Sequence, residues 1–215
     1  VLGQYREELR AERGIDSSAL VMEFGIAYLR RHRSGPFFLW LHFMDPHTPY
    51  DPPERFRSGP TPWESFGSDF SADDVSNLTD EEKRAAQSLY EGEVRYVDDC
   101  VGQVVYELHA LGLEGDTYVC LSSDHGEEFW EHDRWGHGYD LYDEQVRVPL
   151  IIAGPVIRPN RIKAPVSSID VLPTIAELLG SGENPEWHGT SLAPVLSEGG
   201  DEAVHRPVFS QATHF

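Results

Sequence analysis

Apolar side chains at helical spacing mark the first predicted element of the chain. Residues 16–33 carry them three and four positions apart, and Ser17 or Ser18 stands where a helix cap is expected. The apolar positions are Leu20, Val21, Phe24, Ala27, Tyr28 and Leu29. Pro36 ends the pattern, and the unbroken apolar run at 37–41 predicts a strand buried on both faces.

A second, longer helix is predicted from Thr79 to Leu111. Thr79 and Glu82 match a capping box at its start, and Gly112 follows its end. Its inward stripe is predicted to be Leu89, Val94, Val97, Val101, Val104, Val105, Leu108 and Leu111.

Two further apolar runs predict strands at 117–122 and 148–153, followed by a helix at 168–179 that Gly180 closes. Residues 206–211 could add another strand. Strand, helix, strand, loop, strand, helix is the order of an α/β fold, so we expect a largely parallel sheet flanked by helices. In such folds the active site lies beyond the carboxyl ends of the strands.

The charge balance is strongly acidic. Asp and Glu total 37 against 17 Lys and Arg, a formal net charge of −20, and Lys83 and Lys163 are the only lysines. This composition favours a protein adapted to high salt, where screening removes self-repulsion. The alternative is an ordinary acidic protein. In either case nucleic acid is not expected as a partner, because a duplex needs a basic face.

The sequence also bears on membrane insertion and on the role of the two cysteines. No apolar run approaches the roughly 20 residues that span a bilayer, and no signal peptide is visible at the N-terminus. Cys100 falls on a predicted helix face and Cys120 in a predicted strand, so we expect both to be small buried hydrophobes.

Candidate metal ligands follow the second predicted strand. Asp124 and His125 come directly after it, and a carboxylate oxygen and an imidazole nitrogen both bind divalent cations. Gly126 would let the backbone turn sharply away from an ion. Taken alone, the pair is more often a loop-opening aspartate beside a surface histidine.

The loop beyond this pair adds two histidines. His137 lies between Gly136 and Gly138, which permit an unusual backbone path and the close approach of a ligand. His137 could donate a hydrogen bond to an oxyanion or act as an acid. His132 is the weaker candidate and could simply orient the loop.

The first predicted strand also runs into histidines. His47 lies between Pro46 and Pro49, which hold its backbone in a defined path. It opens a loop at 45–77 that is rich in Pro, Gly, Ser and Asp, and a loop of this length is usually functional. His42 lies within the apolar run and is more simply explained as a core histidine.

Four stretches in this order resemble the sulfatase family of the alkaline-phosphatase superfamily. They are FFLWLHFMDPHTPYDP at 37–52, YEGEVRYVDDCVG at 90–102, residues 117–155 around SSDHGEEFWEHDRWGHG, and residues 169–192. The order of the four blocks makes the resemblance specific, whereas an isolated Asp-His-Gly would carry no weight. The resemblance implies an alkaline-phosphatase-like fold and hydrolysis of a sulfate ester of a small molecule or glycan.

The resemblance also implies roles for single residues. Asp124 and His125 fall where the family binds its divalent metal, typically calcium in sulfatases and manganese in related phosphonate and phosphodiester hydrolases. His47 matches a histidine that contacts the sulfate or the leaving oxygen. His137 falls where many members place a lysine against the sulfate and some place histidine.

The chain departs from the family in one respect that concerns the nucleophile. Members begin with a strand ending in two metal-binding aspartates, followed by Cys-x-Pro-x-Arg or Ser-x-Pro-x-Arg, whose Cys or Ser becomes formylglycine. Residues 1–36 contain neither element. We therefore expect residues 1–215 to be the C-terminal portion of a sulfatase-type catalytic domain, inactive alone, with the N-terminal part and a C-terminal subdomain missing.

Two other functions stay open from the sequence. One is a manganese-dependent phosphodiester or phosphonate hydrolase, or a phosphotransferase, since an Asp-His pair suits manganese. The other is a non-catalytic truncated homologue that keeps the scaffold without turnover.

Overall fold

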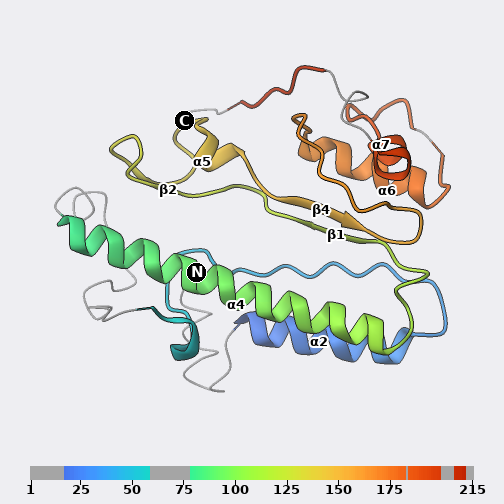
Figure 1. Ribbon diagram of the computed structural model, residues 1–215, viewed down its shortest axis with the longest axis horizontal. Helices are drawn as coiled ribbons and strands as arrows, with labels where there is room; N and C mark the ends of the chain where they lie inside the picture. Colours follow the sequence, from blue (N-terminus) through green and yellow to red (C-terminus); the bar gives the residue numbers. More distant parts are fainter. Residues whose placement is uncertain (1–16, 59–77, 183, 200–205, 212–215) are drawn as a thin grey trace. The chain divides into compact units, whose positions relative to one another are not determined.

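The chain divides into two compact units, residues 1–113 and 114–215. The computed structural model describes residues 17–58, 78–182, 184–199 and 206–211 (Figure 1). Among these, the first unit holds the long helices α2 and α4, and the second holds the short strands with helices α5, α6 and α7.

In the first unit, helix α2 (Ser17–His32) packs against helix α4 (Asp80–Ala110). The Tyr96 hydroxyl accepts the Ala19 N–H at 3.0 Å, and Arg30 makes two hydrogen bonds of 2.8 Å to Glu107. The capping box of α4 is confirmed, with Thr79 and Glu82 each accepting the other's backbone N–H. Ser18 lies inside α2 and donates to Asp45 instead of capping the helix.

The buried face of α4 differs from the predicted stripe. Leu89 and Leu108 are buried as predicted, but Val94 and Val105 are each 43% exposed. The residues that are buried in this helix are Ala86, Leu89, Gly92, Glu93, Tyr96, Cys100 and Leu108. The loop after residue 45 covers Gly92 so closely that a Cβ there would lie 2.8 Å from Pro52. Val97, Val101, Val104 and Leu111 are half-buried, so the predicted stripe fails at Val94 and Val105.

The segment at 37–43 is extended but is not part of a strand ladder among the described residues (Figure 1). Exposure alternates along it: Phe38 and Trp40 are 76% and 73% exposed, while Leu41 packs against Gly25 of α2. His42 shares the exposed face, so its interpretation as a core histidine is wrong. The loop beyond contains the 3-10 turn η1 (Glu54–Phe56), and residues 59–77 lie outside the described part.

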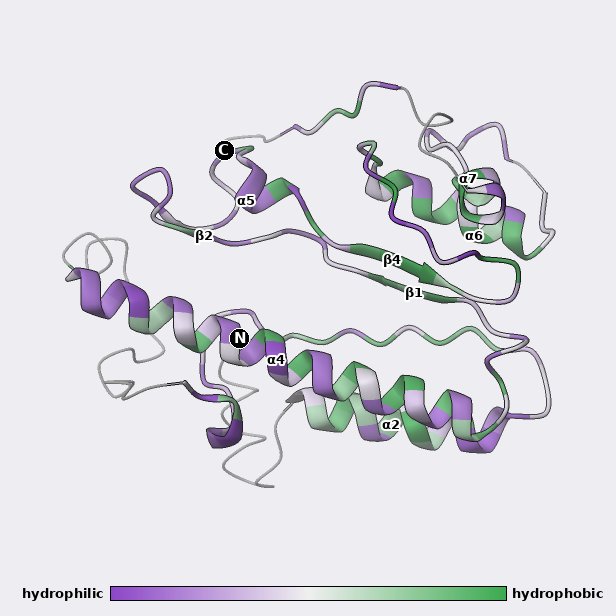
Figure 2. Ribbon diagram, viewed as in Figure 1, coloured by the Kyte–Doolittle hydropathy of each residue, from purple (hydrophilic) through white to green (hydrophobic). Residues whose placement is uncertain are grey.

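The second unit is built on a two-stranded ladder. Strands β1 (Val119–Ser122) and β4 (Leu150–Ala153) fall inside the predicted runs and are apolar along nearly their whole length (Figure 2). They pair antiparallel, with Val119 opposite Ala153 and Ser122 opposite Leu150. The chain between them, which holds the β2–β3 hairpin and one turn of helix, returns to the same end of the ladder that it left. The largely parallel sheet therefore stays a prediction.

A short hairpin follows β1. Strands β2 (Glu128–Phe129) and β3 (Trp135–Gly136) pair antiparallel, and helix α5 (Asp143–Val146) comes before β4. Residues 206–211 form no strand. Cys100 is buried as predicted, but Cys120 is exposed, because it lies on an uncovered position of the β1–β4 ladder.

The rest of the second unit packs around a buried carboxylate. The 3-10 turn η3 (Ser168–Asp170) leads into α6 (Val171–Leu178), and α7 (Ala193–Glu198) follows. Asp170 is fully buried and accepts hydrogen bonds from Ser167 N, Thr190 N and the Arg206 guanidinium. Leu192 and Val195 form the apolar core beside it.

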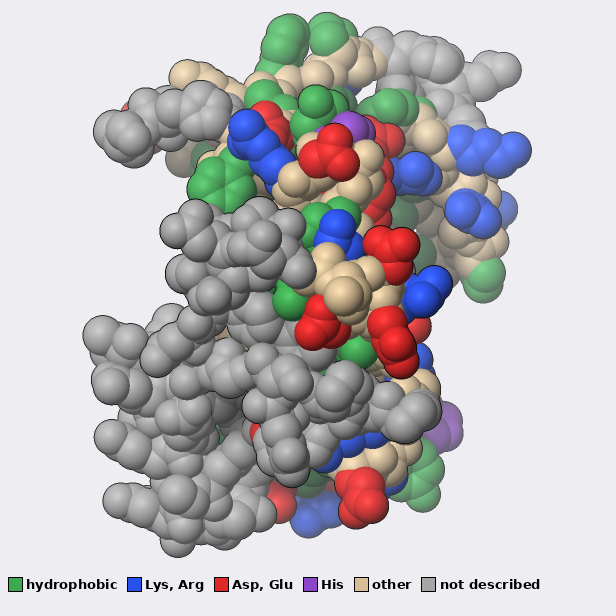
Figure 3. Space-filling model, turned by 90° about the vertical axis from the view of Figure 1, so that its left-hand side faces the viewer, with side chains coloured by type: hydrophobic (Ala, Val, Ile, Leu, Met, Phe, Trp, Pro, Cys, Tyr) green, Lys and Arg blue, Asp and Glu red, His purple; other side chains and the backbone are tan. Residues whose placement is uncertain are grey.

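Two surface properties bear on partners. Within the described ranges, no helix is both long and apolar enough to cross a bilayer. Acidic and basic side chains are interspersed on the face shown in Figure 3, so the acidic excess is not gathered into one patch there.

Candidate functional site

The candidate metal ligands lie on an excursion of the chain between β1 and β4. Because the two strands are antiparallel, the excursion leaves Ser122 and returns to Leu150 at the same end of the ladder. The Ser122 hydroxyl donates to the Pro149 carbonyl at 3.0 Å and closes this end. The excursion is therefore anchored at both ends, while its interior carries the polar side chains.

Asp124 and His125 open the excursion. The Asp124 side chain is 79% exposed, and its Oδ1 lies 3.9 Å from His125 Nε2. His125 Nδ1 lies 2.8 Å from the Gly126 carbonyl, which can only accept, so Nδ1 carries the hydrogen. The Nε2 atom, 3.9 Å from the Asp124 carboxylate, therefore keeps its lone pair. This arrangement of an imidazole held through its other nitrogen is typical of metal-binding histidines.

Gly126 serves a different purpose from the one expected. A Cβ at this position would overlap the Glu144 carbonyl oxygen, and Gly126 N donates to the Gln145 carbonyl at 2.7 Å. Its φ is not in the left-handed region. Glycine is required here because α5 approaches the backbone closely, and not because of the turn itself.

His137 is held against the metal-ligand candidates. Its ring stacks on that of His125 with centroids 3.7 Å apart and an interplanar angle of 23°. Its Nδ1 donates to Glu127 Oε1 at 2.9 Å, and the Glu127 side chain is only 5% exposed. This hydrogen bond raises the pKa of His137; burial opposes the shift, and the charges of Glu127 and Asp124 add to it.

The glycines beside His137 have the backbone that the sequence predicted. Gly136 and Gly138 have φ of 99° and 88°, a region that side chains disfavour. His137 therefore lies at the end of the β2–β3 hairpin between two left-handed residues. A side chain at either neighbour would strain the path that brings His137 to His125.

A buried polar network beneath these residues was not anticipated from the sequence. Glu128 is fully buried and Gln145 nearly so. Gln145 donates to Glu128 at 3.0 Å and accepts Gly138 N at 2.9 Å. In the sequence both positions look like ordinary polar loop residues. The only available signal was the run Glu127-Glu128, whose two carboxylates directly follow Gly126.

His132 contacts residues of the loop and not the metal-ligand candidates. Its ring stacks on Tyr142 at 3.5 Å, and its backbone N–H donates to Glu128 Oε1 at 3.0 Å. Its Nδ1 lies 3.4 Å from the same oxygen. These contacts agree with a role in orienting the loop.

His47 belongs to the first unit. Its Nδ1 donates to the Thr48 carbonyl at 2.8 Å, and its backbone N–H donates to Met44. The loop around it is tied down by the buried Asp45, which accepts from Ser18, and by Glu93, which accepts Asp51 N at 2.8 Å. Its convergence with the residues of the second unit stays a prediction.

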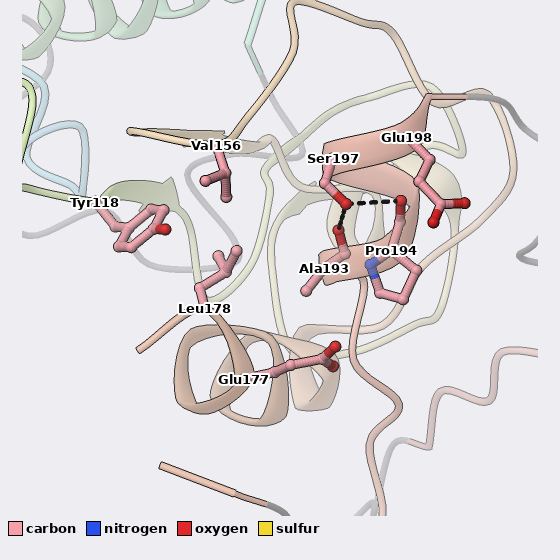
Figure 4. Close-up of a pocket in the computed structure, with 8 residues that line it drawn as sticks. All are labelled: Tyr118, Val156, Glu177, Leu178, Ala193, Pro194, Ser197 and Glu198. Carbon is pink, nitrogen blue, oxygen red and sulfur yellow. Dashed lines mark hydrogen bonds between the residues drawn. The ribbon is translucent and has the colours of Figure 1, made fainter. Parts of the chain in front are cut away.

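A hollow of about 360 Å³ lies elsewhere in the second unit (Figure 4). It is lined by residues of α6 and α7 together with Tyr118 and Val156. Tyr118 precedes β1, whereas Asp124 follows it, so the hollow lies at the other end of this strand. The Ser197 hydroxyl donates to carbonyls of its own helix, at Ala193 and Pro194. The hollow is thus separate from the candidate metal ligands.

The donor set meets some of the requirements of a divalent metal. Asp124 and His125 offer one oxygen and one nitrogen, and the tautomer of His125 leaves the ligating atom on the correct side. Within the described residues, no group of three or more His, Cys, Asp or Glu side chains could hold an ion. The pair therefore fits a metal but supplies only part of a coordination shell.

Comparison with known proteins places the chain in a family. The Sulfatase family model matches residues 3–181. The multifunctional alkaline phosphatase superfamily protein PehA of Trinickia caryophylli is 34% identical over 88% of this chain and 43% of its own length. The choline-sulfatase of Rhizobium meliloti is 33% identical over 56% of this chain and 24% of its length.

A solved structure supports the same relationship. The phosphonate monoester hydrolase of Agrobacterium radiobacter is similar with a TM-score of 0.73 and 25% identity, covering 86% of this chain and 43% of that one. The chain thus spans less than half the length of each of these relatives. The structural similarity confirms the predicted alkaline-phosphatase-like fold. The family match shows that the chain belongs to the Sulfatase family.

Proposed function

We propose that this chain supplies part of the metal and substrate site of a metal-dependent sulfatase, which hydrolyses a sulfate ester of a small molecule or glycan. The observation that carries the proposal is the stacking of His137 on His125, directly beside Asp124. Membership of the Sulfatase family supports the reaction class. Because the chain matches less than half of its relatives' length, the activity is proposed for a longer protein.

Asp124 and His125 are assigned to the metal. When bound, a divalent cation supplies positive charge that offsets the charge of an anionic ester. His125 is kept ready for ligation by its hydrogen bond to the Gly126 carbonyl, which fixes its tautomer. Calcium is the expected ion, as in the sulfatases that the sequence resembles, and manganese is the alternative.

His137 and His47 are assigned to the ester oxygens. Glu127 holds His137 through Nδ1, so a contact with the substrate would be made through Nε2. His47 is held in the same manner through the Thr48 carbonyl. Both rings are thereby restrained through Nδ1, and Nε2 would donate to an equatorial or leaving oxygen in the protonated imidazolium form.

The nucleophile is assigned to a segment outside these 215 residues. A formylglycine made from Cys or Ser in an x-Pro-x-Arg context is expected there, together with two further metal-binding aspartates. The 215 residues alone are accordingly proposed to be inactive, with residues 1–215 forming a C-terminal portion of the catalytic domain.

A second candidate function is hydrolysis of a phosphonate or phosphodiester with manganese. It is supported by the similarity to a phosphonate monoester hydrolase at a TM-score of 0.73 and by the nitrogen ligand in the Asp124-His125 pair. A non-catalytic homologue is the third possibility. It predicts no turnover of either ester by the longer protein.

The deciding experiment measures both activities in the longer protein that contains this chain. Release of sulfate from an aryl sulfate with calcium, lost in Asp124→Ala and retained in the matched surface variant Asp116→Ala, supports the proposal. Manganese-dependent cleavage of an aryl phosphonate or bis-aryl phosphate without sulfate release would overturn it in favour of the second function. Absence of both activities would favour the third.

A further inference from the structure

We propose that Gln145 is a positioning residue that sets the placement of His137 relative to His125. It reaches both histidine-bearing turns at once. Its backbone carbonyl accepts the N–H of Gly126, the residue after His125, at 2.7 Å. Its side-chain Oε1 accepts the N–H of Gly138, the residue after His137, at 2.9 Å. One residue of α5 therefore connects the two turns.

The chemistry of the bridge requires a carboxamide. On one side stands the Gly138 N–H, a donor, and on the other stands Glu128 Oε2, an acceptor. A glutamine satisfies both, with its oxygen toward Gly138 and its nitrogen toward Glu128 at 3.0 Å. A glutamate at position 145 would bring two carboxylates together, and an apolar residue would remove the partner of both groups.

Glu128 fixes the orientation of this amide. It is fully buried at the start of β2, and its Oε1 accepts the His132 N–H at 3.0 Å while Oε2 accepts from Gln145. Because the Gly138 N–H can only donate and the Glu128 carboxylate can only accept, a single orientation of the Gln145 amide pairs with both. The buried pair thus joins the β2–β3 hairpin to α5.

The consequence for the site lies in the two rings. His125 and His137 stack at 3.7 Å although they are twelve positions apart in the chain. Their relative position depends on the backbone turns at Gly126 and Gly138, and both turns are bonded to Gln145. The role of Gln145 in placing the rings is independent of the proposed function; only its consequence for metal binding rests on that function.

The test uses two single variants of the 215-residue chain and one double variant in which the residues at positions 128 and 145 are swapped. Gln145→Glu and Glu128→Gln each break the donor–acceptor match. The double variant Q145E/E128Q restores it, because the carboxylate then at position 145 would accept from both the Gly138 N–H and the carboxamide then at position 128. This double variant has the same net charge and the same two side chains as the unaltered chain. Gln103→Glu, an exposed glutamine on α4, is the matched control for the added charge.

The readout is the proton–proton nuclear Overhauser effect between the rings of His125 and His137, with circular dichroism as a check on folding. We expect it to be lost in both single variants, present in Q145E/E128Q and unchanged in Q103E. Its survival in the single variants, or its absence in a folded double variant, would overturn the proposal. In the unaltered chain the Gly138 amide should exchange slowly with deuterium, and fast exchange would also overturn it.

Metal binding separates this proposal from the proposed function. Manganese should broaden the resonances of Asp124 and His125 in the unaltered chain. The single variants should weaken manganese binding by about 10- to 100-fold, and Q145E/E128Q should restore it. Ring proximity that follows the expected pattern without any manganese broadening would leave the role of Gln145 standing and contradict the metal assignment.

Discussion

His125 and His137 lie face to face, with ring centroids 3.7 Å apart and an interplanar angle of 23°. Each ring has its Nδ1 committed, His125 to the Gly126 carbonyl and His137 to the Glu127 carboxylate. The stacking therefore combines two imidazoles whose orientations are set by different partners. Each partner can be altered separately by mutation.

Removing either metal-ligand candidate should abolish metal binding by the chain. Asp124→Ala removes the oxygen and His125→Ala removes the nitrogen, so the broadening by manganese of signals near Gly126 should disappear in both. Asp116→Ala, which removes an exposed loop carboxylate, should leave it unchanged. Broadening that persists in both site variants would place the ion elsewhere.

Glu127→Gln should lower the pKa of His137. The hydrogen bond to Glu127 is the largest cause of the raised pKa, and the substitution removes the charge while keeping the shape. The titration is followed from the His137 ring protons in the metal-free chain. Glu23→Gln on the exposed face of α2 carries the same charge change and should not shift it.

The same contact should make stability depend on pH. A histidine with a raised folded-state pKa adds stability that is complete below its unfolded value, near 6.5, and is lost as pH rises through the folded-state value. The unaltered chain should therefore lose more stability than E127Q between slightly acid and mildly alkaline pH. Parallel pH profiles from urea unfolding would contradict this coupling.

Asp170→Asn should destabilise the second unit. The buried carboxylate accepts from Ser167, Thr190 and Arg206, and an amide in its place turns a donor toward one of these donors. We expect a loss of about 1–3 kcal/mol in the free energy of unfolding, measured with urea. Asp116→Asn, at an exposed loop position, should change it little.

Alanine at two glycines should have opposite effects on the free energy of unfolding. In Gly126→Ala the Cβ would overlap the Glu144 carbonyl oxygen, so we expect a loss of about 1–3 kcal/mol. Gly102 lies in α4 with nothing within 4 Å of a Cβ, so Gly102→Ala should stabilise by about 0.4–1 kcal/mol. Equal effects in urea unfolding would mean that α5 yields easily to the new methyl group.

Several features of the fold could be predicted because they depend on neighbouring residues. Thr79 and Glu82 lie three positions apart, so the capping box that begins α4 is visible in the sequence. The glycines around His137 have the left-handed φ that two flanking glycines indicate. The position of Asp124-His125 directly after a strand also follows from the apolar run of β1.

Other features depend on which distant residues meet, and hydrophobicity does not encode this. Glu93 of α4 is buried and accepts Asp51 N from the distant loop, while Val94 beside it is exposed. The antiparallel pairing of β1 with β4 depends on how the chain between them returns.

The sequence by itself determined helices α2, α4 and α6, the apolar strands β1 and β4, and the histidines and aspartate that resemble a sulfatase site. Those properties follow from local spacing and from short-range hydrogen bonds. Only the tertiary structure decided that Glu127 holds His137 and that Gln145 joins Gly126 to Gly138. A polar side chain becomes part of a buried network only when its partner arrives from another segment, and that meeting is a property of the folded chain.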